Sequence, residues 1–147
     1  MNAASFSRLD AIELRVYYED TDFSGNVYHA SYLRFFERGR TEWLRRLGLE
    51  NLALSLSSGF LFAVRSLRVD YLVPARMDDL LRVETVLSSL GGASIEFEQQ
   101  ISRRERSLVR ATVLVAAVRR GRAARLPDEL RGALQTCLGD EAAHERR

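Results

Sequence analysis

The chain has 147 residues, of which 46% are hydrophobic, and a formal net charge of +2. A domain of this length buries about two-thirds of the surface that its unfolded chain exposes, so it can fold without a disulfide or a metal ion. The basic residues are all arginine and lack the clustering and interleaved aromatic residues of a nucleic-acid surface, so we expect no nucleic-acid partner.

The cysteine count and the hydropathy pattern indicate a cytoplasmic protein. Cys137 is the single cysteine and cannot form an internal disulfide, which favours a reducing compartment and a role as a small apolar packing residue. Residues 1–10 lack the features of a signal peptide, and no apolar run approaches the ~20 residues of a membrane-spanning helix.

The first predicted element is a strand. Ile12, Leu14, Val16 and Tyr18 alternate with charged or polar residues, which predicts a half-buried strand with Tyr18 on its inward face. Residues 19–26 are polar, contain turn-forming residues and a glycine, and are predicted to form a loop.

A long amphipathic helix is predicted over residues 27–47, ended by Gly48. Gly39 lies on its apolar stripe, where glycine lowers helix propensity by about 1 kcal/mol relative to alanine. We therefore expect another backbone to approach the helix closely at Gly39.

Four strand-like runs and a short helix follow. The runs cover residues 60–73, 81–87, 95–101 and 108–118, and the last is apolar on both faces, as in a central strand. Asn51–Ser58 fits either a loop or a short helical turn. Pro127 begins the predicted helix, and the segment 139–147 is predicted to fray. One domain over residues 1–138 results.

This order of elements predicts an α+β fold. Strands that are joined by short turns pair antiparallel, and their apolar face needs a cover. The helix over residues 27–47 is the only predicted element long enough, so we expect a five-stranded antiparallel sheet wrapped around one central helix.

The junction between the first loop and the helix holds the residues best suited to chemistry. Asp22 can act as a general base or as a nucleophile, and His29 can exchange a proton near neutral pH. Backbone N–H groups near residues 27–30, at the helix start, can stabilise an oxyanion.

Each of these residues also has a structural interpretation. Asp22 fits a turn or cap, Asn26 fits an N-cap, His29 fits a structural histidine, and Tyr18 fits a core residue. Spacing alone leaves both interpretations open.

A longer set of residues carries a family resemblance. The set comprises Tyr17–Asp22, Gly25, Val27–Tyr32, Phe36–Arg38, Arg40–Glu42, Val69–Tyr71, Pro74–Arg76, Asp78–Asp79 and Leu126–Pro127. Over roughly residues 11–131 the chain resembles the YbgC-type acyl-CoA thioesterases, in the 4-hydroxybenzoyl-CoA thioesterase branch of the hotdog-fold superfamily.

The resemblance implies a hotdog fold and a thioester hydrolase that uses no metal or redox cofactor. It implies that Asp22 acts as nucleophile or general base, that the backbone N–H of His29 polarises the thioester carbonyl, and that Tyr18 supports the site. It also implies homodimers that assemble into tetramers, with active sites at subunit interfaces, and an association with the Tol-Pal cell-envelope system.

The sequence departs from the family pattern at Phe23 and Asn26, which affects the pocket, and in the turn at residues 90–94, which lacks basic residues for the CoA phosphates. Either Arg65, Arg68 or Arg76 replaces them, or an acyl carrier protein delivers the acyl group.

A non-hydrolytic binding module for acyl-CoA or acyl carrier protein is the main alternative function. A hotdog hydratase is a third, and Glu37 is an alternative base.

Overall fold

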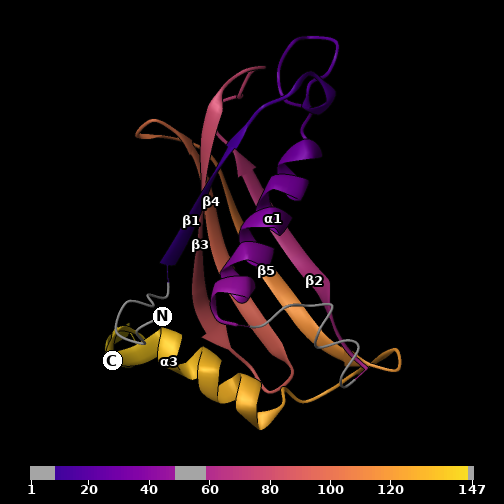
Figure 1. Ribbon diagram of the computed structural model, residues 1–147, viewed down its shortest axis with the longest axis vertical. Helices are drawn as coiled ribbons and strands as arrows, with labels where there is room; N and C mark the ends of the chain where they lie inside the picture. The colour runs from indigo at the N-terminus through magenta and orange to yellow at the C-terminus, as the bar shows by residue number, and fades with distance from the viewer. Residues whose placement is uncertain (1–8, 49–58, 146–147) are drawn as a thin grey trace.

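The computed structural model describes residues 9–48 and 59–145, which form an antiparallel sheet with one long helix against its inner face (Figure 1). The elements are β1 (Leu9–Arg15), the 3-10 helix η2 (Tyr18–Asp20), α1 (Ser31–Arg46), β2 (Phe60–Tyr71), β3 (Leu80–Leu90), β4 (Ser94–Arg103), β5 (Arg106–Arg119), β6 (Arg122–Ala123) and α3 (Asp128–Glu145). The predicted α+β fold, with five long antiparallel strands around one helix, is confirmed. The sequence did not predict β6, a short strand that pairs with β5.

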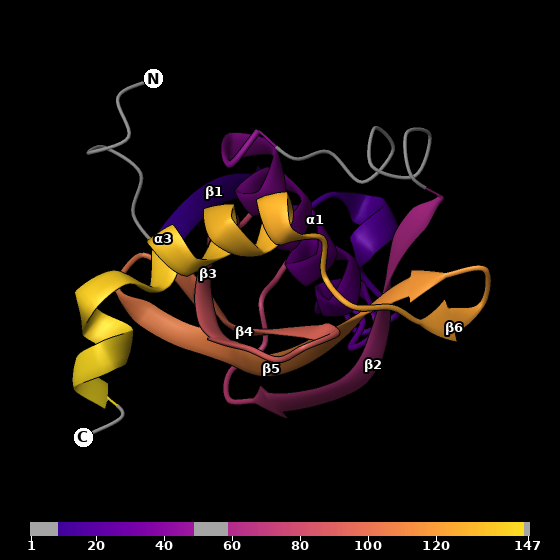
Figure 2. The ribbon, with the colours of Figure 1, turned by 90° about the horizontal axis from the view of Figure 1, so that it is seen from below.

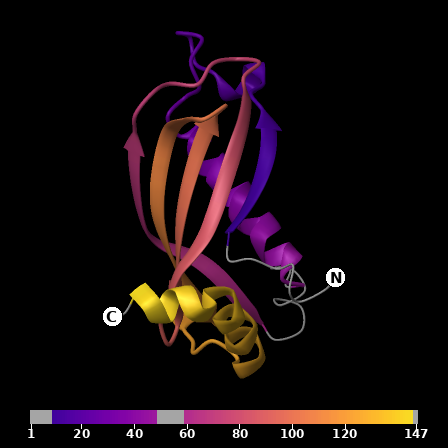
Figure 3. The same cartoon turned by 90° about the vertical axis from the view of Figure 1, so that its left-hand side faces the viewer.

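The strand order is β1-β3-β4-β5-β2, which corrects the expectation that consecutive strands all pair. β2 and β3 are adjacent in sequence but lie apart, because β2 pairs with β5 at one edge of the sheet. Residues 72–79 form a connection that crosses the end of the sheet from β2 to β3 (Figure 3). We call these residues the crossing connection. Its length allows the chain to cross the sheet, whereas a tight turn would force the two strands to pair.

The helix and the first strand are shorter than the sequence predicts. α1 begins at Ser31 rather than near Val27, because Val27 forms a bridge with Thr21 instead of a helical turn. β1 ends at Arg15, so Tyr18 lies in η2 and its ring is 82% exposed rather than inward-facing. The ambiguous segment 51–58 lies outside the described residues.

The core lies between α1 and the inner face of the sheet. Period-two alternation places Leu81, Val83, Phe97 and Val113 on that face, where they are buried with Trp43 of α1. The ring of Trp43 makes an edge-on contact with Phe97, with 5.3 Å between ring centroids. Burial of such side chains is the main stabilising term of the fold.

α1 packs tightly against the sheet at Gly39, as the sequence predicts, but the atoms that approach it belong to side chains rather than to another backbone. A Cβ at this position would lie 2.8 Å from Oγ1 of Thr85 and 2.9 Å from Cγ1 of Val83. The amide of buried Gln99 donates to the backbone oxygen of Phe36 at 2.9 Å, and its Oε1 accepts from Arg40 at 3.0 Å. The helix is thus fixed to β4 by polar contacts as well as by packing.

α3 (Asp128–Glu145) lies across one end of the sheet, where it packs against β3 (Figure 2). It covers the core with Leu130, Leu134 and Cys137, all buried, and burial raises the pKa of the Cys137 thiol to about 11. The expected packing role of Cys137 is therefore confirmed. The helix continues to Glu145, past the position where the sequence predicts a frayed tail.

No helix within residues 9–48 and 59–145 is long and apolar enough to cross a membrane.

We expect Gly39→Ala to lower the free energy of unfolding by about 1–2 kcal/mol, because overpacking in a tight contact outweighs the gain in helix propensity. Thr85 and Val83 are stiff β-branched side chains and cannot move aside easily. Gly132→Ala in α3 is the matched control, since a Cβ there meets nothing within 4 Å and should stabilise the helix slightly. Urea unfolding of both variants tests this, and a more stable Gly39→Ala protein would contradict it.

Candidate active site

The loop between β1 and α1 is organised by a buried carboxylate. Asp20 accepts a hydrogen bond from the backbone N–H of Tyr17 at 2.9 Å and forms an ion pair with Arg34 at 3.3 Å. Its backbone oxygen accepts the N–H of Tyr28 at 2.9 Å. The chain therefore folds back on itself before the helix begins.

The crossing connection fixes the other side of this loop. Val27 donates its N–H to the backbone oxygen of Ala75 at 2.8 Å, and Asn26 forms an isolated bridge with Arg76. Ala75 in turn donates its N–H to Oη of Tyr32 at 2.9 Å, which holds the first turn of α1. Asn26 is thus a bridge residue and not an N-cap. The N-cap of α1 is Ala30.

Two backbone N–H groups remain without acceptors ahead of the helix. The sequence predicts free N–H groups near residues 27–30, but those of Val27 and Tyr28 are used, as described above. Within the described chain, only His29 and Ala30 of this stretch donate their N–H to no protein acceptor. Unpaired N–H groups just before a helix are well suited to bind an oxyanion.

A cavity of about 280 Å³ lies over this junction. It is lined by Asp22, Ser24, Asn26, Val27, His29, Tyr32, Tyr71, Leu72, Val73 and Pro74. The structure therefore brings together Asp22 and His29, the two polar residues that the sequence singles out. The crossing connection and the end of β2 form the opposite wall.

Asp22 is held in its charged form by its neighbour Ser24. Its Oδ1 accepts hydrogen bonds from the hydroxyl of Ser24 at 2.5 Å and from the Ser24 backbone N–H at 2.8 Å. These two bonds, with a smaller contribution from nearby His29, lower the pKa of Asp22 below its ordinary value. Both Ser24 bonds use Oδ1, so Oδ2 has no protein partner among the described residues.

Tyr18 is not part of this cavity. The ring projects into solvent from η2, and the polar contact of Tyr18 in this loop is its backbone oxygen, which accepts the hydroxyl of Thr21 at 2.7 Å. The expectation that Tyr18 faces inward failed because β1 ends before it. Tyr18 lies beyond the strand, so the alternation of inward and outward side chains does not apply to it.

The alternative base Glu37 lies at a second, smaller cavity of about 190 Å³ between α1 and the sheet. That cavity is lined by Glu37 and Arg40 together with apolar residues such as Phe62, and not by Asp22 or His29. Neither cavity is lined by Trp43, which is buried in the core, or by Phe23, which is fully exposed.

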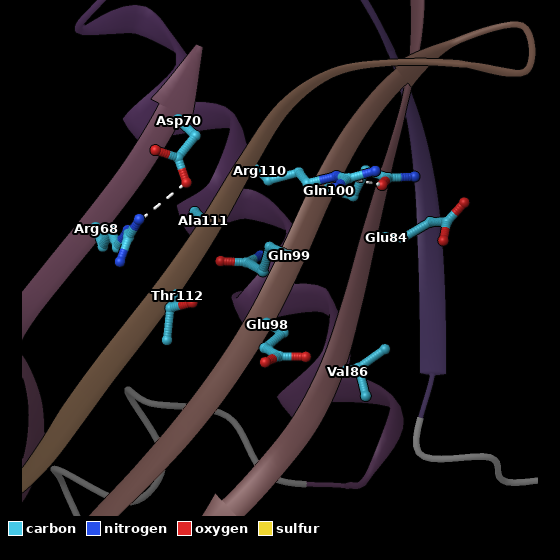
Figure 4. A pocket seen from close by; sticks show the side chains of 10 residues that line it. All are labelled: Arg68, Asp70, Glu84, Val86, Glu98, Gln99, Gln100, Arg110, Ala111 and Thr112. Carbon is cyan, nitrogen blue, oxygen red and sulfur yellow. Dashed lines mark hydrogen bonds and ion pairs between the residues drawn. The ribbon is translucent and has the colours of Figure 1, made fainter. Parts of the chain in front are cut away.

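A cavity of about 470 Å³ lies on the outer face of the sheet, opposite α1 (Figure 4). Its lining is mostly charged or polar, and Arg68 forms an ion pair there with Asp70 at 3.6 Å. Arg68, one of the arginines considered for the CoA phosphates, thus lines this cavity and not the cavity that Asp22 lines.

Two residues that shape the candidate site were not predicted. Ser24 stands two positions after Asp22 in a polar loop, a spacing typical of side-chain turns that could have signalled its contact. Tyr71 belongs to the Val69–Tyr71 run, but its contact with the helix start depends on tertiary structure.

Among the described residues, no three His, Cys, Asp or Glu side chains are grouped closely enough to hold a metal ion.

A family model described as the thioesterase-like superfamily matches residues 16–134. The chain belongs to this superfamily. The match covers the candidate site, the strands β2 to β6 and the first part of α3, and it begins just after β1.

Close relatives confirm the YbgC-type resemblance. The acyl-CoA thioesterase YbgC of Haemophilus influenzae is 51% identical over 109 residues, which cover 74% of this chain and 80% of that protein. The acyl-CoA thioester hydrolase YbgC of Escherichia coli is 47% identical over 106 residues, which cover 71% of this chain and 78% of the relative.

Solved structures confirm the hotdog fold. A probable thioesterase from Bartonella henselae superposes with a TM-score of 0.78 at 43% identity, covering 81% of this chain and 99% of the other. The 4-hydroxybenzoyl-CoA thioesterase of a Pseudomonas species has a TM-score of 0.80 at 19% identity, covering 86% of this chain and 99% of the other, and supports the fold alone.

We expect Ser24→Ala to raise the pKa of Asp22, because the hydroxyl bond that favours the carboxylate is lost. If ionised Asp22 is the active form, the acidic limb of the kcat/KM profile will move to higher pH, while activity near pH 8 stays close to wild type. Thr21→Ser, which keeps a hydroxyl outside the Asp22 contact, is the control. An unchanged acidic limb would contradict the role of Ser24.

Proposed function

We propose that this protein is an acyl-CoA thioesterase that hydrolyses an acyl thioester to a free acid and CoA. One observation carries the proposal. Asp22, a charged carboxylate with a free oxygen, and His29 line one cavity in a chain of the thioesterase-like superfamily, and the N–H groups of His29 and of the next residue, Ala30, have no acceptor among the described residues. The names of the relatives support acyl-CoA as the substrate class.

The proposed chemistry needs only two groups. The thioester carbonyl binds against the free N–H groups, which stabilise the developing oxyanion by about 2.7–4 kcal/mol for one such donor. Oδ2 of Asp22 either removes a proton from a water that attacks the carbonyl carbon, or attacks that carbon itself to form an anhydride that water then hydrolyses. In both routes the C–S bond breaks, the sulfur leaves as a thiolate and takes up a proton, and a carboxylic acid is released.

Histidine 29 has two proposed contributions. Its backbone N–H polarises the carbonyl, and its imidazole can donate a proton to the leaving sulfur. Both contributions are proposals that its position on the cavity wall supports. Tyr18 is not among the residues that line this cavity, so its supporting role stays a prediction from the family resemblance.

We expect Asp22→Asn to lower kcat by about 10²- to 10⁴-fold, since the neutral amide can neither take a proton nor attack the carbonyl. Asp22 is exposed, so the thermal midpoint should change little. Release of free thiol from short-chain, long-chain and aromatic acyl-CoAs, followed with a thiol reagent, measures the loss. Glu37→Gln is the matched control and should retain activity. An Asp22→Asn enzyme with most of its turnover would refute the assignment.

The alternatives make different predictions in the same assay. A non-hydrolytic binding module would shift in thermal stability with acyl-CoA and release no thiol. If an acyl carrier protein is the true donor, turnover will be much faster with the acylated carrier than with acyl-CoA. A hotdog hydratase would add water to an enoyl-CoA without releasing thiol.

We also propose that the protein works as a homodimer or a tetramer built from such dimers. β2 is an edge strand of the sheet and has β5 as its one strand neighbour. Leu61 and Val64, on this edge, are 53% and 51% exposed, an arrangement that favours pairing with another strand. Antiparallel pairing of β2 with β2 of a second copy would satisfy both edges about one twofold axis.

Val64→Glu should shift the protein toward a monomer of 16.7 kDa, because the twofold axis would place two like charges in one interface that otherwise holds exposed apolar side chains. Size-exclusion chromatography with light scattering measures the mass. Leu80→Glu, also at an exposed leucine but on β3, is the control and should keep the wild-type mass. A Val64→Glu protein that retains that mass would exclude this interface.

The proposed compartment is the cytoplasm, which the single buried cysteine supports because a buried free thiol is typical of a reducing environment. The association with the Tol-Pal system stays a prediction from the family resemblance.

A further inference from the structure

The peptide group between His29 and Ala30 has a contact that the proposed reaction does not yet use. Tyr71, the last residue of β2, donates its hydroxyl to the backbone oxygen of His29 at 2.8 Å. This oxygen and the N–H of Ala30 belong to the same peptide group. Tyr71 therefore contacts the acceptor end of a peptide group whose donor end has no partner among the residues that the structure describes.

The Tyr71 side chain is held in place. Its ring makes an edge contact with Tyr32, at 5.6 Å between centroids, and Tyr32 is fixed by the N–H of Ala75 at 2.9 Å. Both rings line the cavity that contains Asp22. Partial burial raises the pKa of Tyr71 above its ordinary value, so the hydroxyl remains a donor at neutral and mildly alkaline pH.

A hydrogen bond to a peptide oxygen strengthens the N–H of that same peptide group. The two ends share one conjugated system, so electron density drawn toward the oxygen leaves the N–H more positive. Such cooperative strengthening is about 10–30% per bond in condensed-phase estimates. The same bond also fixes the orientation of the peptide plane.

We infer that Tyr71 is a positioning residue for the oxyanion site, acting through the His29–Ala30 peptide to orient and strengthen the Ala30 N–H as a second donor beside that of His29. This inference rests on the proposed thioester hydrolysis. It assigns a role to the end of β2, a strand distant in sequence from Asp22.

Tyr71→Phe isolates the hydroxyl, because the ring and its contact with Tyr32 remain. We expect kcat to fall about 3- to 10-fold, with KM within twofold of wild type, because the bond matters most when charge develops on the carbonyl oxygen. The thermal midpoint should stay within a few degrees. Tyr17→Phe, at an exposed ring outside the cavity, is the matched control and should leave kcat unchanged.

A spectroscopic measurement separates this role from a general structural effect. The best substrate of the acyl-CoA panel, labelled with ¹³C at the thioester carbonyl, is bound to Asp22→Asn protein and to Asp22→Asn/Tyr71→Phe protein. Donors at the oxygen lower the carbonyl stretching frequency, so the double variant should show a band closer to that of free substrate. This comparison is made at low temperature, which keeps it valid if Tyr71→Phe is less stable.

The outcomes distinguish the two proposals. If wild type releases thiol, and Tyr71→Phe changes neither kcat nor the carbonyl band, the role of Tyr71 is wrong and the proposed function stands. If wild type releases no thiol from any acyl-CoA or acylated carrier, the proposed function is wrong. An equal loss of activity and stability without a shift of the band would likewise overturn the positioning role.

Discussion

The candidate site depends on the hydrogen bonds between the crossing connection and the chain that precedes α1. The connection receives the N–H of Val27 at Ala75, and its far end pairs with Val16, where β1 ends. One segment therefore joins the first strand, the polar loop and the start of the helix. Because Val27 donates its N–H to this connection and Tyr28 donates its N–H to Asp20, the free donors among the described residues are those of His29, which lines the cavity, and of Ala30, which follows it.

Two aspartates in the same loop have opposite environments. Asp20 is buried, and its carboxylate is occupied by a backbone N–H and an arginine, so it organises the loop. Asp22, two residues later, is exposed, and both of its Ser24 bonds fall on a single oxygen. Asp20 is the last residue of the 3-10 helix η2 and is buried, whereas Asp22 follows that helix and lines the cavity. A free, charged oxygen is what general-base or nucleophilic chemistry requires.

Local periodicity predicted the elements whose burial is set by alternation, such as β3 and β4, and it predicted the close contact at Gly39. It failed where distant segments decide the structure. The β2–β5 pairing, the helix start at Ser31 and the exposure of Tyr18 all depend on where the crossing connection lies, and no pattern within those segments carries that information. Asp22 and His29 were identifiable because chemistry and family resemblance agree on them, whereas the contact of Tyr71 is visible only in three dimensions.

α1 is held against the rest of the protein at two places along its length. Gly39 and Gln99 hold the middle of the helix against the sheet, while Tyr32 and the crossing connection hold its first turn. A helix held at both points can neither slide nor tilt without breaking buried polar contacts, which are costly to leave unpaired. The donors ahead of Ser31 are therefore already in place before substrate arrives. Preorganised donors stabilise developing charge without reorganisation, which is why a small set of groups on a rigid hotdog scaffold is sufficient for an activated acyl donor such as a thioester.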